Sequence, residues 1–409
     1  MEVAVLGAPS ARGRRVVRDL LERPEVSRVV FVGDNERQLI RLAAGFGEDL
    51  VRVAKAAPTV DGIAEGLTGC DVAVATLQPE SSPERGHIGA ELAAFEAALA
   101  ARVPYVTACE DPAAIDVLLS PRFTAERRSR PATAGPATSP IGTSTVTADE
   151  PVVAGMSWTP GLSNILVRAA ADRFEAVRTV RVAWSTSRND KGADGLGRLI
   201  AGWAGDATVI KDGARKNRPP GSKSEQVFFP EPVGWQRVHT VRGAEVASLP
   251  KLLGGLESLV VQGGMGGASA STVAQMVARA PAAAASAPPV VALGRPEEGH
   301  TPSSARRRLG ILTRAPALGL GPFARRPSGW SALRIDVTGR AAGTEKTETY
   351  GVVDHLANLE AGPIVAAALL MGREVSTGRG VLAPEAAFAP GPFLAQLAEF
   401  GIRVAHLER

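Results

Sequence analysis

The chain has 409 residues, of which 45% are hydrophobic, 22% charged and 4% aromatic, and its formal net charge is +4. This length provides two or three domains, and the mild positive charge lacks the clustered basic face that nucleic-acid binding needs. Two cysteines and five scattered histidines exclude a disulfide framework and a metal-ligand cluster, and no apolar run reaches membrane-spanning length, so we expect no metal, nucleic-acid or membrane partner.

Strands and helices alternate in the first third of the chain. Met1 leads directly into an apolar stretch rather than a signal peptide, so we expect a cytoplasmic protein. Helical spacing of apolar residues predicts helices after residue 13, at 60–67, 88–101 and up to 119, and again at 161–174. Apolar runs predict strands between them at 2–6, 28–32, 51–54, 71–76, 103–108 and 152–157. This alternation predicts a parallel sheet with right-handed crossovers, interrupted by a Pro/Ser/Thr-rich loop at 121–150.

The second half of the chain has a different pattern. Strands are predicted at 180–185, 226–229, 237–241 and 258–262, and a hairpin is predicted from 330–338 and 345–353. These strands favour a mixed or antiparallel sheet. A basic stretch at 211–223, broken by Gly and Pro, predicts either a loop that meets an anionic small molecule or solvated surface. A peripheral segment at 281–305 and an apolar helix at 359–371 precede a tail with a strand or turn, a helix and a last strand.

A glycine turn, Gly7-Ala-Pro-Ser-Ala-Arg-Gly13, follows the first predicted strand and opens the first predicted helix. Gly7 permits a sharp turn, Gly13 permits close packing of helix on strand, and the helix N-terminus presents N–H groups to a pyrophosphate. Pro9 and Ser10 stand where the usual pattern has its middle glycine, and the Ser10 hydroxyl is a candidate phosphate donor. Asp34 follows the second strand, about 20 residues on, where a carboxylate binds the adenine ribose.

Asp34 favours NAD over NADP, because a carboxylate repels a 2′-phosphate. Arg37 and Arg41 are the alternative, since they are able to hold that phosphate. We therefore expect NAD as the preferred cofactor and NADP as the alternative, although a nucleotide-like fold without a nucleotide stays open. The predicted cofactor-binding residues in this part of the chain are Gly7, Pro9, Ser10, Ala11, Arg12, Gly13, Asp34, Asn35, Arg37, Thr76, Leu77, Gln78 and Cys109.

A further motif, Gly155-Met-Ser-Trp-Thr-Pro160-Gly161-Leu-Ser-Asn164, follows a predicted strand and opens a predicted helix. This G-x-x-x-x-P-G-x-x-N pattern resembles the saccharopine dehydrogenase-like family, which includes lysine 6-dehydrogenase-like and carboxynorspermidine dehydrogenase-like enzymes. Further resemblance lies in 7–16, in 103–111 and in Gly380-Val-Leu-Ala-Pro384-Glu385. The order of these motifs along the chain carries the resemblance, which is patchy between residues 190 and 330.

The resemblance implies an α/β fold in which an inserted domain interrupts a Rossmann dinucleotide-binding domain. The boundaries we expect are 1–165 for the Rossmann domain, 166–353 for an α+β substrate and dimerisation domain, and 354–409 for a C-terminal segment that returns to the Rossmann domain. The resemblance also implies a homodimer and hydride transfer between NAD(P) and a C–N bond of an amine, imine, amino-acid-like or polyamine-like substrate. Pro160 and Asn164 map onto the hinge and join the cofactor-binding candidates, with Asn164 expected to bind the nicotinamide amide or a substrate carboxylate.

Few residues are candidates for the general base that an amine substrate requires. Asp111, after the fifth strand, and His239, in the second half, are the predicted catalytic residues. Asp111 fits an N-cap of the next helix equally well, and a lone histidine is more often structural. Weaker candidates are Glu110, His355 and Tyr350. The candidates for binding a substrate carboxylate are Arg188, Lys191, Arg198, Lys211, Arg215 and Lys216, of which none is favoured.

Two other functions fit the same residues. One is an enzyme that retains its NAD and uses transient oxidation for a redox-neutral amine transfer or rearrangement, as homospermidine synthase-like relatives do. The other is a non-catalytic dinucleotide-binding sensor, favoured by the absent middle glycine and by the scarcity of acid–base residues. Turnover separates the sensor from both enzymes, and net formation of NADH separates the two enzymes.

Overall fold

The computed structural model describes residues 1–47, 49–77, 86–120, 150–187, 202–203, 205–266, 329–376 and 378–407. Several expectations fall outside these described residues and are not taken further. They are the segments 121–149 and 281–305, the cofactor-binding candidate Gln78, and the cations Arg188, Lys191 and Arg198.

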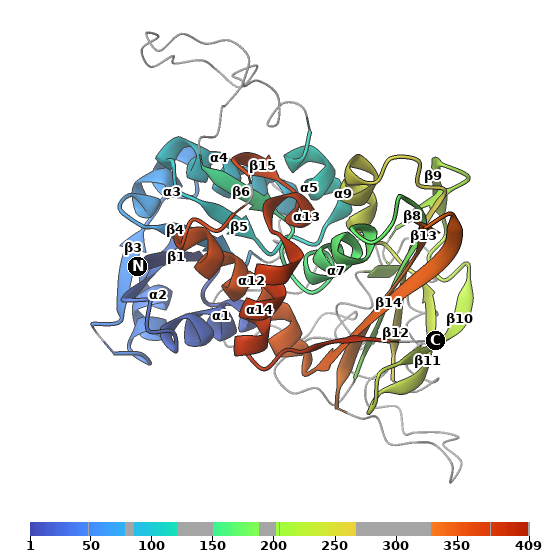
Figure 1. Cartoon of the computed structure of the whole chain (residues 1–409). Helices are drawn as coiled ribbons and strands as arrows, with labels where there is room; N and C mark the ends of the chain where they lie inside the picture. The colour runs from blue at the N-terminus through green and yellow to red at the C-terminus, as the bar shows by residue number, and fades with distance from the viewer. Residues whose placement is uncertain are drawn as a thin grey trace, which may run out of the picture.

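Seven strands form a parallel sheet in the order β15-β6-β5-β4-β1-β2-β3 (Figure 1). These strands are β1 (Glu2–Leu6), β2 (Arg28–Gly33), β3 (Val51–Lys55), β4 (Val72–Ala75), β5 (Tyr105–Thr107), β6 (Pro151–Ala154) and β15 (Gly380–Leu382). The sheet is of Rossmann type, as expected, and its strand order reverses between β1 and β4. Ligands of such sheets bind in the crevice outside the carboxyl ends of the strands at this reversal.

Helices cover both faces of the parallel sheet. The described helices of the chain are α1 (Ala11–Leu21), α2 (Glu36–Ala43), α3 (Val60–Leu67), α4 (Gly86–Ala101), α5 (Pro112–Leu118), α7 (Leu162–Ala171), α9 (Glu245–Leu252), α12 (Leu356–Gly372), α13 (Pro384–Ala387) and α14 (Pro390–Glu399). Of these, α7 and α9 pack against strands of a second sheet. Val3 and Val5 of β1 pack with α1 and α12 on one face, whereas Ala4 and Leu6 pack with α3 and α4 on the other. Strands buried on both faces are the reason that the first half reads as continuous apolar runs.

Nine further strands form a mixed sheet in the order β10-β11-β12-β7-β13-β14-β16, with β8 beside β12 and β9 beside β8. They are β7 (Ala176–Thr186), β8 (Ala207–Lys211), β9 (Ala214–Arg218), β10 (Ser224–Phe229), β11 (Gly234–Thr240), β12 (Ser258–Met265), β13 (Ser331–Ala341), β14 (Thr344–Asp354) and β16 (Val404–His406). The expected β13–β14 hairpin is confirmed, with a tighter turn at Ala342-Gly343. Only β7 and β12 pair in parallel among the described strands of this sheet.

Residues 211–218 of the basic stretch lie in a hairpin rather than in the predicted loop, whereas the alternative prediction of solvated surface fits the mostly exposed stretch. Lys211 pairs with Ala214 at the end of an antiparallel β8–β9 hairpin. Its two turn residues, Asp212 and Gly213, have φ angles of 56° and 74°. An Asp-Gly pair is a strong hairpin signal, because both positions must adopt positive φ. The helices α2 and α9 were also absent from the expectations.

The C-terminal segment contributes to both sheets. β15 extends the parallel sheet beside β6, whereas β16 pairs with β14 at the edge of the mixed sheet. The domain boundaries at 165 and 353 stay a prediction, and only part of the final segment lies in the Rossmann sheet. In the part of the chain that the structure describes, no helix is long and apolar enough to cross a membrane.

Candidate functional site

The turn between β1 and α1 has the close approaches that its glycines allow. Gly7 has a φ of 80°, and a Cβ on Gly13 would lie 2.2 Å from the Gly7 carbonyl oxygen. Arg14 donates the first backbone hydrogen bond of the helix, to Ser10. The N–H groups of Ala11 and Arg12 therefore lie at the open N-terminal end of α1, outside the carboxyl end of β1.

The side chain of Ser10 caps the N-terminus of α1. Its side-chain oxygen accepts a hydrogen bond from the Gly13 N–H at 2.8 Å, and its hydroxyl lies 3.4 Å from the Thr76 carbonyl oxygen. Thr76, predicted to line the cofactor cleft, is buried, and its hydroxyl lies 3.1 Å from the Gly7 carbonyl oxygen, to which it can donate. Both hydroxyls hold the turn against β4, so the expectation that Ser10 donates to phosphate finds no support in this geometry.

Arg12 turns inward instead of extending toward solvent. Its guanidinium donates to the Ala108 carbonyl oxygen at 3.1 Å and lies 2.9 Å from a Glu110 oxygen and 3.4 Å from a Glu360 oxygen. Burial lowers the pKa of Arg12, but the charges of Glu110 and Glu360 outweigh burial and raise the pKa above its usual value. The side chain of Arg12 thus ties the glycine turn to the end of β5 and to α12.

A buried carboxyl group lies behind the carboxyl end of β5. Glu91 of α4 accepts a hydrogen bond from the Thr107 hydroxyl at 2.7 Å, and the Cys109 N–H donates to the same Thr107 oxygen at 3.1 Å. Burial raises the pKa of Glu91 to about 7. Burial also raises the pKa of the Cys109 thiol, so Cys109 is a protonated, apolar group below the crevice.

The free energy of unfolding should decrease as the pH rises, because the pKa of Glu91 is raised in the folded state. A carboxyl group whose pKa is raised in the folded state stabilises the fold fully below about pH 4.5, and this contribution is lost as the pH rises to about 7. The loss corresponds to about 3 kcal/mol of unfolding free energy. We expect Glu91→Gln to remove this slope in denaturant titrations from pH 4.5 to 7.5, whereas Glu65→Gln at an exposed position keeps it. An unchanged slope in the Glu91 variant would contradict the assignment.

The two predicted catalytic residues lie in different surroundings. Asp111 caps α5, accepting hydrogen bonds from the N–H groups of Ala113 at 2.8 Å and Ala114 at 3.2 Å, and it lies 3.6 Å from the guanidinium of Arg242. Asp111 therefore has the capping role that was its alternative. His239 is 3% exposed in β11 and packs edge-on against Trp203. Neither geometry adds support for a general base.

The residues predicted to hold the adenine ribose lie beyond the end of β2. Asp34, Asn35 and Arg37 are all exposed there. Asn35 caps α2 by accepting from the Gln38 N–H at 3.2 Å. Leu77, half-buried, follows β4 on the other side of the glycine turn. The structure thus places the candidate ribose and phosphate contacts along the edge of the parallel sheet at which its strands have their carboxyl ends.

Asn164 is completely buried at the start of α7, where it joins three segments of the chain. Its side-chain oxygen accepts from the Gly161 N–H at 3.0 Å, and its amide nitrogen donates to Ser248 at 2.8 Å and to Glu385 at 2.9 Å. An amide with both hydrogens donated has none left for a ligand. Asn164 is therefore a connector between α7, α9 and α13, and its predicted contact with nicotinamide finds no support here. Pro160 is likewise buried.

Two buried glutamates flank Asn164, and neither was predicted as part of the site. Glu245 accepts hydrogen bonds from the hydroxyls of Thr159 at 2.5 Å and Ser163 at 2.7 Å. Burial raises the pKa of both Glu245 and Glu385. The sequence identified Pro384-Glu385 only as part of a family-like motif. Glu245 had no local signal, because Pro250 within α9 argues against a helix there. Among the described residues, no metal-binding group of three or more His, Cys, Asp or Glu is found.

A pair of buried tryptophans joins the loop after β6 to the mixed sheet. Trp158, in the loop after β6, packs against Trp184 near the end of β7, with their ring centroids 6.0 Å apart. Both side chains are buried. This contact brings the loop at the carboxyl end of β6 against the carboxyl-terminal part of β7, so the mixed sheet adjoins the carboxyl edge of the parallel sheet.

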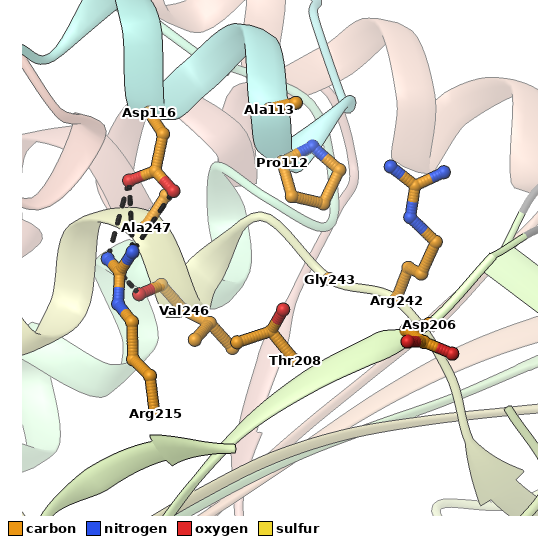
Figure 2. Close-up of a pocket in the computed structure, with 10 residues that line it drawn as sticks. All are labelled: Pro112, Ala113, Asp116, Asp206, Thr208, Arg215, Arg242, Gly243, Val246 and Ala247. Carbon is orange, nitrogen blue, oxygen red and sulfur yellow. Dashed lines mark hydrogen bonds and ion pairs between the residues drawn. The ribbon is translucent and has the colours of Figure 1, made fainter. Parts of the chain in front are cut away.

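A separate pocket of about 180 Å³ lies between α5, α9 and the β8–β9 hairpin (Figure 2). Arg215 contacts Asp116 at 3.1 Å and donates to the Val246 carbonyl oxygen at 3.0 Å. Lys216, outside this pocket, pairs with Asp212 at 2.8 Å. These candidate carboxylate ligands thus have partners within the protein, and the pocket does not select one of them for a substrate.

No family model and no curated protein matches the chain. Among solved structures, it is similar to apo saccharopine dehydrogenase (L-Glu forming) from Saccharomyces cerevisiae, with 13% sequence identity, 100% of both chains covered and a TM-score of 0.63. An NADPH-dependent quinone oxidoreductase from Escherichia coli matches 26% of this chain and 35% of its own, with 20% identity and a TM-score of 0.22. Triphenylmethane reductase from Citrobacter matches 26% of this chain and 36% of its own, with 18% identity and a TM-score of 0.22.

Only the first of these similarities is strong enough to compare folds. It extends over the whole chain and includes both the parallel and the mixed sheet. The resemblance expected from the motifs at 7–16, 155–164 and 380–385 is thereby confirmed at the level of the fold. The chain has a saccharopine dehydrogenase-like fold.

Proposed function

We propose that this protein is an NAD(P)-dependent oxidoreductase that transfers hydride at a C–N bond of an amine, imine, amino-acid-like or polyamine-like substrate. The observation that carries the proposal is the glycine turn at the reversal point of a Rossmann-type sheet, within a chain of saccharopine dehydrogenase-like fold. We further propose that the protein is a cytoplasmic homodimer, and sedimentation of the purified chain tests the oligomeric state.

The residues at the turn fit a dinucleotide. Ala11 and Arg12 offer backbone N–H groups at the open end of α1, where the helix dipole favours a pyrophosphate. Gly7 and Gly13 bring this end close to β1 and β4, since a Cβ on either residue would lie within 3 Å of a backbone oxygen. Asp34 is exposed beyond β2, where it is able to accept hydrogen bonds from a ribose.

The chemistry of a bound nicotinamide is to accept or donate a hydride. The protein contributes position and charge around it. Arg12 carries one positive charge between Glu110 and Glu360, so this group of three side chains has a net negative charge when both glutamates are ionised. A negative charge at the end of β5 favours a cationic amine or iminium over a neutral carbonyl compound.

Asp34→Ala should lower the affinity for NAD about tenfold, because the ribose hydroxyls lose a charged hydrogen-bond acceptor. The same variant should bind NADP more tightly than the unaltered protein does, since the repulsion of the 2′-phosphate is removed. Calorimetric titration with both nucleotides measures the two affinities. Asp49→Ala, at another exposed aspartate, is the matched control. If neither affinity changes in the Asp34 variant, the ribose contact is elsewhere.

A panel of amines with NAD, and of keto acid and amine pairs with NADH, tests the reaction itself through the absorbance of the reduced nicotinamide. Turnover of at least one pair is expected. Product formation without net NADH would favour the redox-neutral amine transfer. Binding of dinucleotide without any turnover would favour the sensor and overturn the proposed reaction.

A further inference from the structure

The carboxyl end of β7 lies next to the start of β13. Beyond Trp184, the Ser187 hydroxyl accepts a hydrogen bond from the Gly329 N–H at 3.1 Å. Ala332 of β13 pairs with Ser185 of β7. The residues immediately before β13 therefore lie at the carboxyl end of β7, where Trp184 contacts Trp158.

Trp330 and His355 stack on each other at this end of the mixed sheet. Their ring centroids are 4.5 Å apart and their planes differ by 19°. Ser331 pairs with Asp354, so the β13–β14 hairpin holds the two rings together. Trp330 is 36% exposed and His355 is exposed. An exposed, stacked aromatic pair is suited to contact a ligand.

The helix α12 connects this pair to the glycine turn. His355 is the N-cap residue of α12, and Glu360, in the second turn of the same helix, contacts Arg12 at 3.4 Å. At about 1.5 Å of rise per residue, His355 lies roughly 8 Å along the helix from Glu360. The stacked pair thus lies at the N-terminal end of α12, about one and a half helical turns from the residue that contacts Arg12 of the glycine turn.

We propose that His355 is the acid–base residue of the reaction and that Trp330 holds its imidazole ring in place beside the substrate nitrogen. This inference rests on the proposed function and names a residue for it. Histidine is the side chain that most often transfers protons in catalysis near neutral pH. Unlike His239, which is buried in β11, His355 is exposed at the start of α12.

The proposed reaction transfers one proton to His355 and one hydride to NAD. In the oxidative direction, a nitrogen of the His355 imidazole accepts one proton from the substrate ammonium group. The freed lone pair on the amine then forms the C=N bond as the hydride leaves the adjacent carbon for the nicotinamide ring of NAD. An iminium ion, one reduced cofactor and one imidazolium result, and in the reverse direction His355 returns the proton.

Carboxylates lie on α12 and around its first turn. The Asp354 carboxylate accepts hydrogen bonds from the His355 backbone N–H at 2.6 Å and from Asn358 at 2.9 Å. Glu360 follows on the same helix, and Arg12, which contacts it, is also bound by Glu110. The bonds to Asp354 hold the backbone of the first turn of α12, on which His355 lies.

His355→Gln keeps a polar side chain and removes proton transfer. With an amine that the unaltered protein oxidises, we expect kcat to fall about 100-fold, while the affinity for NAD stays within a factor of about two. Added imidazole should restore part of the rate to His355→Ala, a rescue that a purely structural role would not show. Trp330→Leu should lose less in kcat than the His355 variants. His406→Gln, at another histidine of the mixed sheet, is the matched control and should keep both kcat and KM.

A second measurement does not depend on turnover. NAD should shift the imidazole resonances of His355 in NMR spectra, whereas ADP-ribose, which lacks nicotinamide, should not. If the unaltered protein binds NAD and oxidises no amine, the proposed function fails and this inference with it. If the unaltered protein is active and His355→Gln retains its rate, or if NAD and ADP-ribose act alike on His355, the inference alone is overturned and the proposed function stands.

Discussion

Replacing Asn164 by leucine is expected to lower the free energy of unfolding by about 4 kcal/mol, as measured in denaturant titrations. The substitution leaves the Gly161 N–H, the Ser248 hydroxyl and the Glu385 carboxyl without the hydrogen bonds that they make to the amide. All of these groups are buried, so water does not replace the lost partner. Each unsatisfied buried group costs about 1–3 kcal/mol.

Asn217→Ala is the matched control for the Asn164 variant. Asn217 accepts a hydrogen bond from the Thr208 hydroxyl at 3.0 Å, but on the exposed surface of the β8–β9 hairpin. Its replacement should change the unfolding free energy by no more than about 0.5 kcal/mol. Equal losses in the two variants would show that Asn164 does not connect α7, α9 and α13 in the way the structure indicates.

Gly13→Ala is expected to weaken dinucleotide binding about 100-fold and to destabilise the fold by about 1–3 kcal/mol. The added Cβ would lie 2.2 Å from the Gly7 carbonyl oxygen and 2.8 Å from the Thr76 hydroxyl oxygen, so α1 must move away from β1. This movement displaces the N–H groups of Ala11 and Arg12 from the phosphates. Calorimetric titration with NAD and thermal unfolding measure the two effects.

Gly89→Ala is the control that separates the effect of the position in the fold from the effect of replacing a glycine by alanine. Gly89 lies within α4, and a Cβ there meets no atom within 4 Å. Alanine in a helix is more stable than glycine by about 0.5–1 kcal/mol, so this variant should unfold at a slightly higher temperature and bind NAD normally. Normal NAD binding by Gly13→Ala would mean that the glycine turn does not hold the pyrophosphate.

The parallel sheet was predictable because its signals are local. Continuous apolar runs such as Val3–Leu6 and Val72–Ala75 arise from burial on both faces, and helices of amphipathic spacing separate them. The β13–β14 hairpin was predictable for the same reason, since β-rich runs flank a glycine-containing turn. The β8–β9 hairpin was missed although Asp212-Gly213 is a strong local signal, because the basic residues around it were interpreted as loop.

The candidate site was less predictable than the fold. Gly7, Gly13 and Asp34 were found because each belongs to a short motif whose geometry is local. The inward turn of Arg12 had no signal in the sequence, because its partners Glu110 and Glu360 are distant along the chain. The contacts of Asp111 with Arg242 and of His239 with Trp203 likewise join residues that are distant along the chain.

The sequence by itself determined the fold class and the position of the glycine turn, because apolar periodicity and turn residues act over a few positions. Only the tertiary structure decided which polar groups meet. Asn164 and Glu385, 221 residues apart, share a hydrogen bond that depends on the packing of α7 against α13. Trp330 and His355 stack because strand register aligns Ser331 with Asp354. Such contacts depend on how whole elements pack, so the local sequence around each residue does not predict its partner.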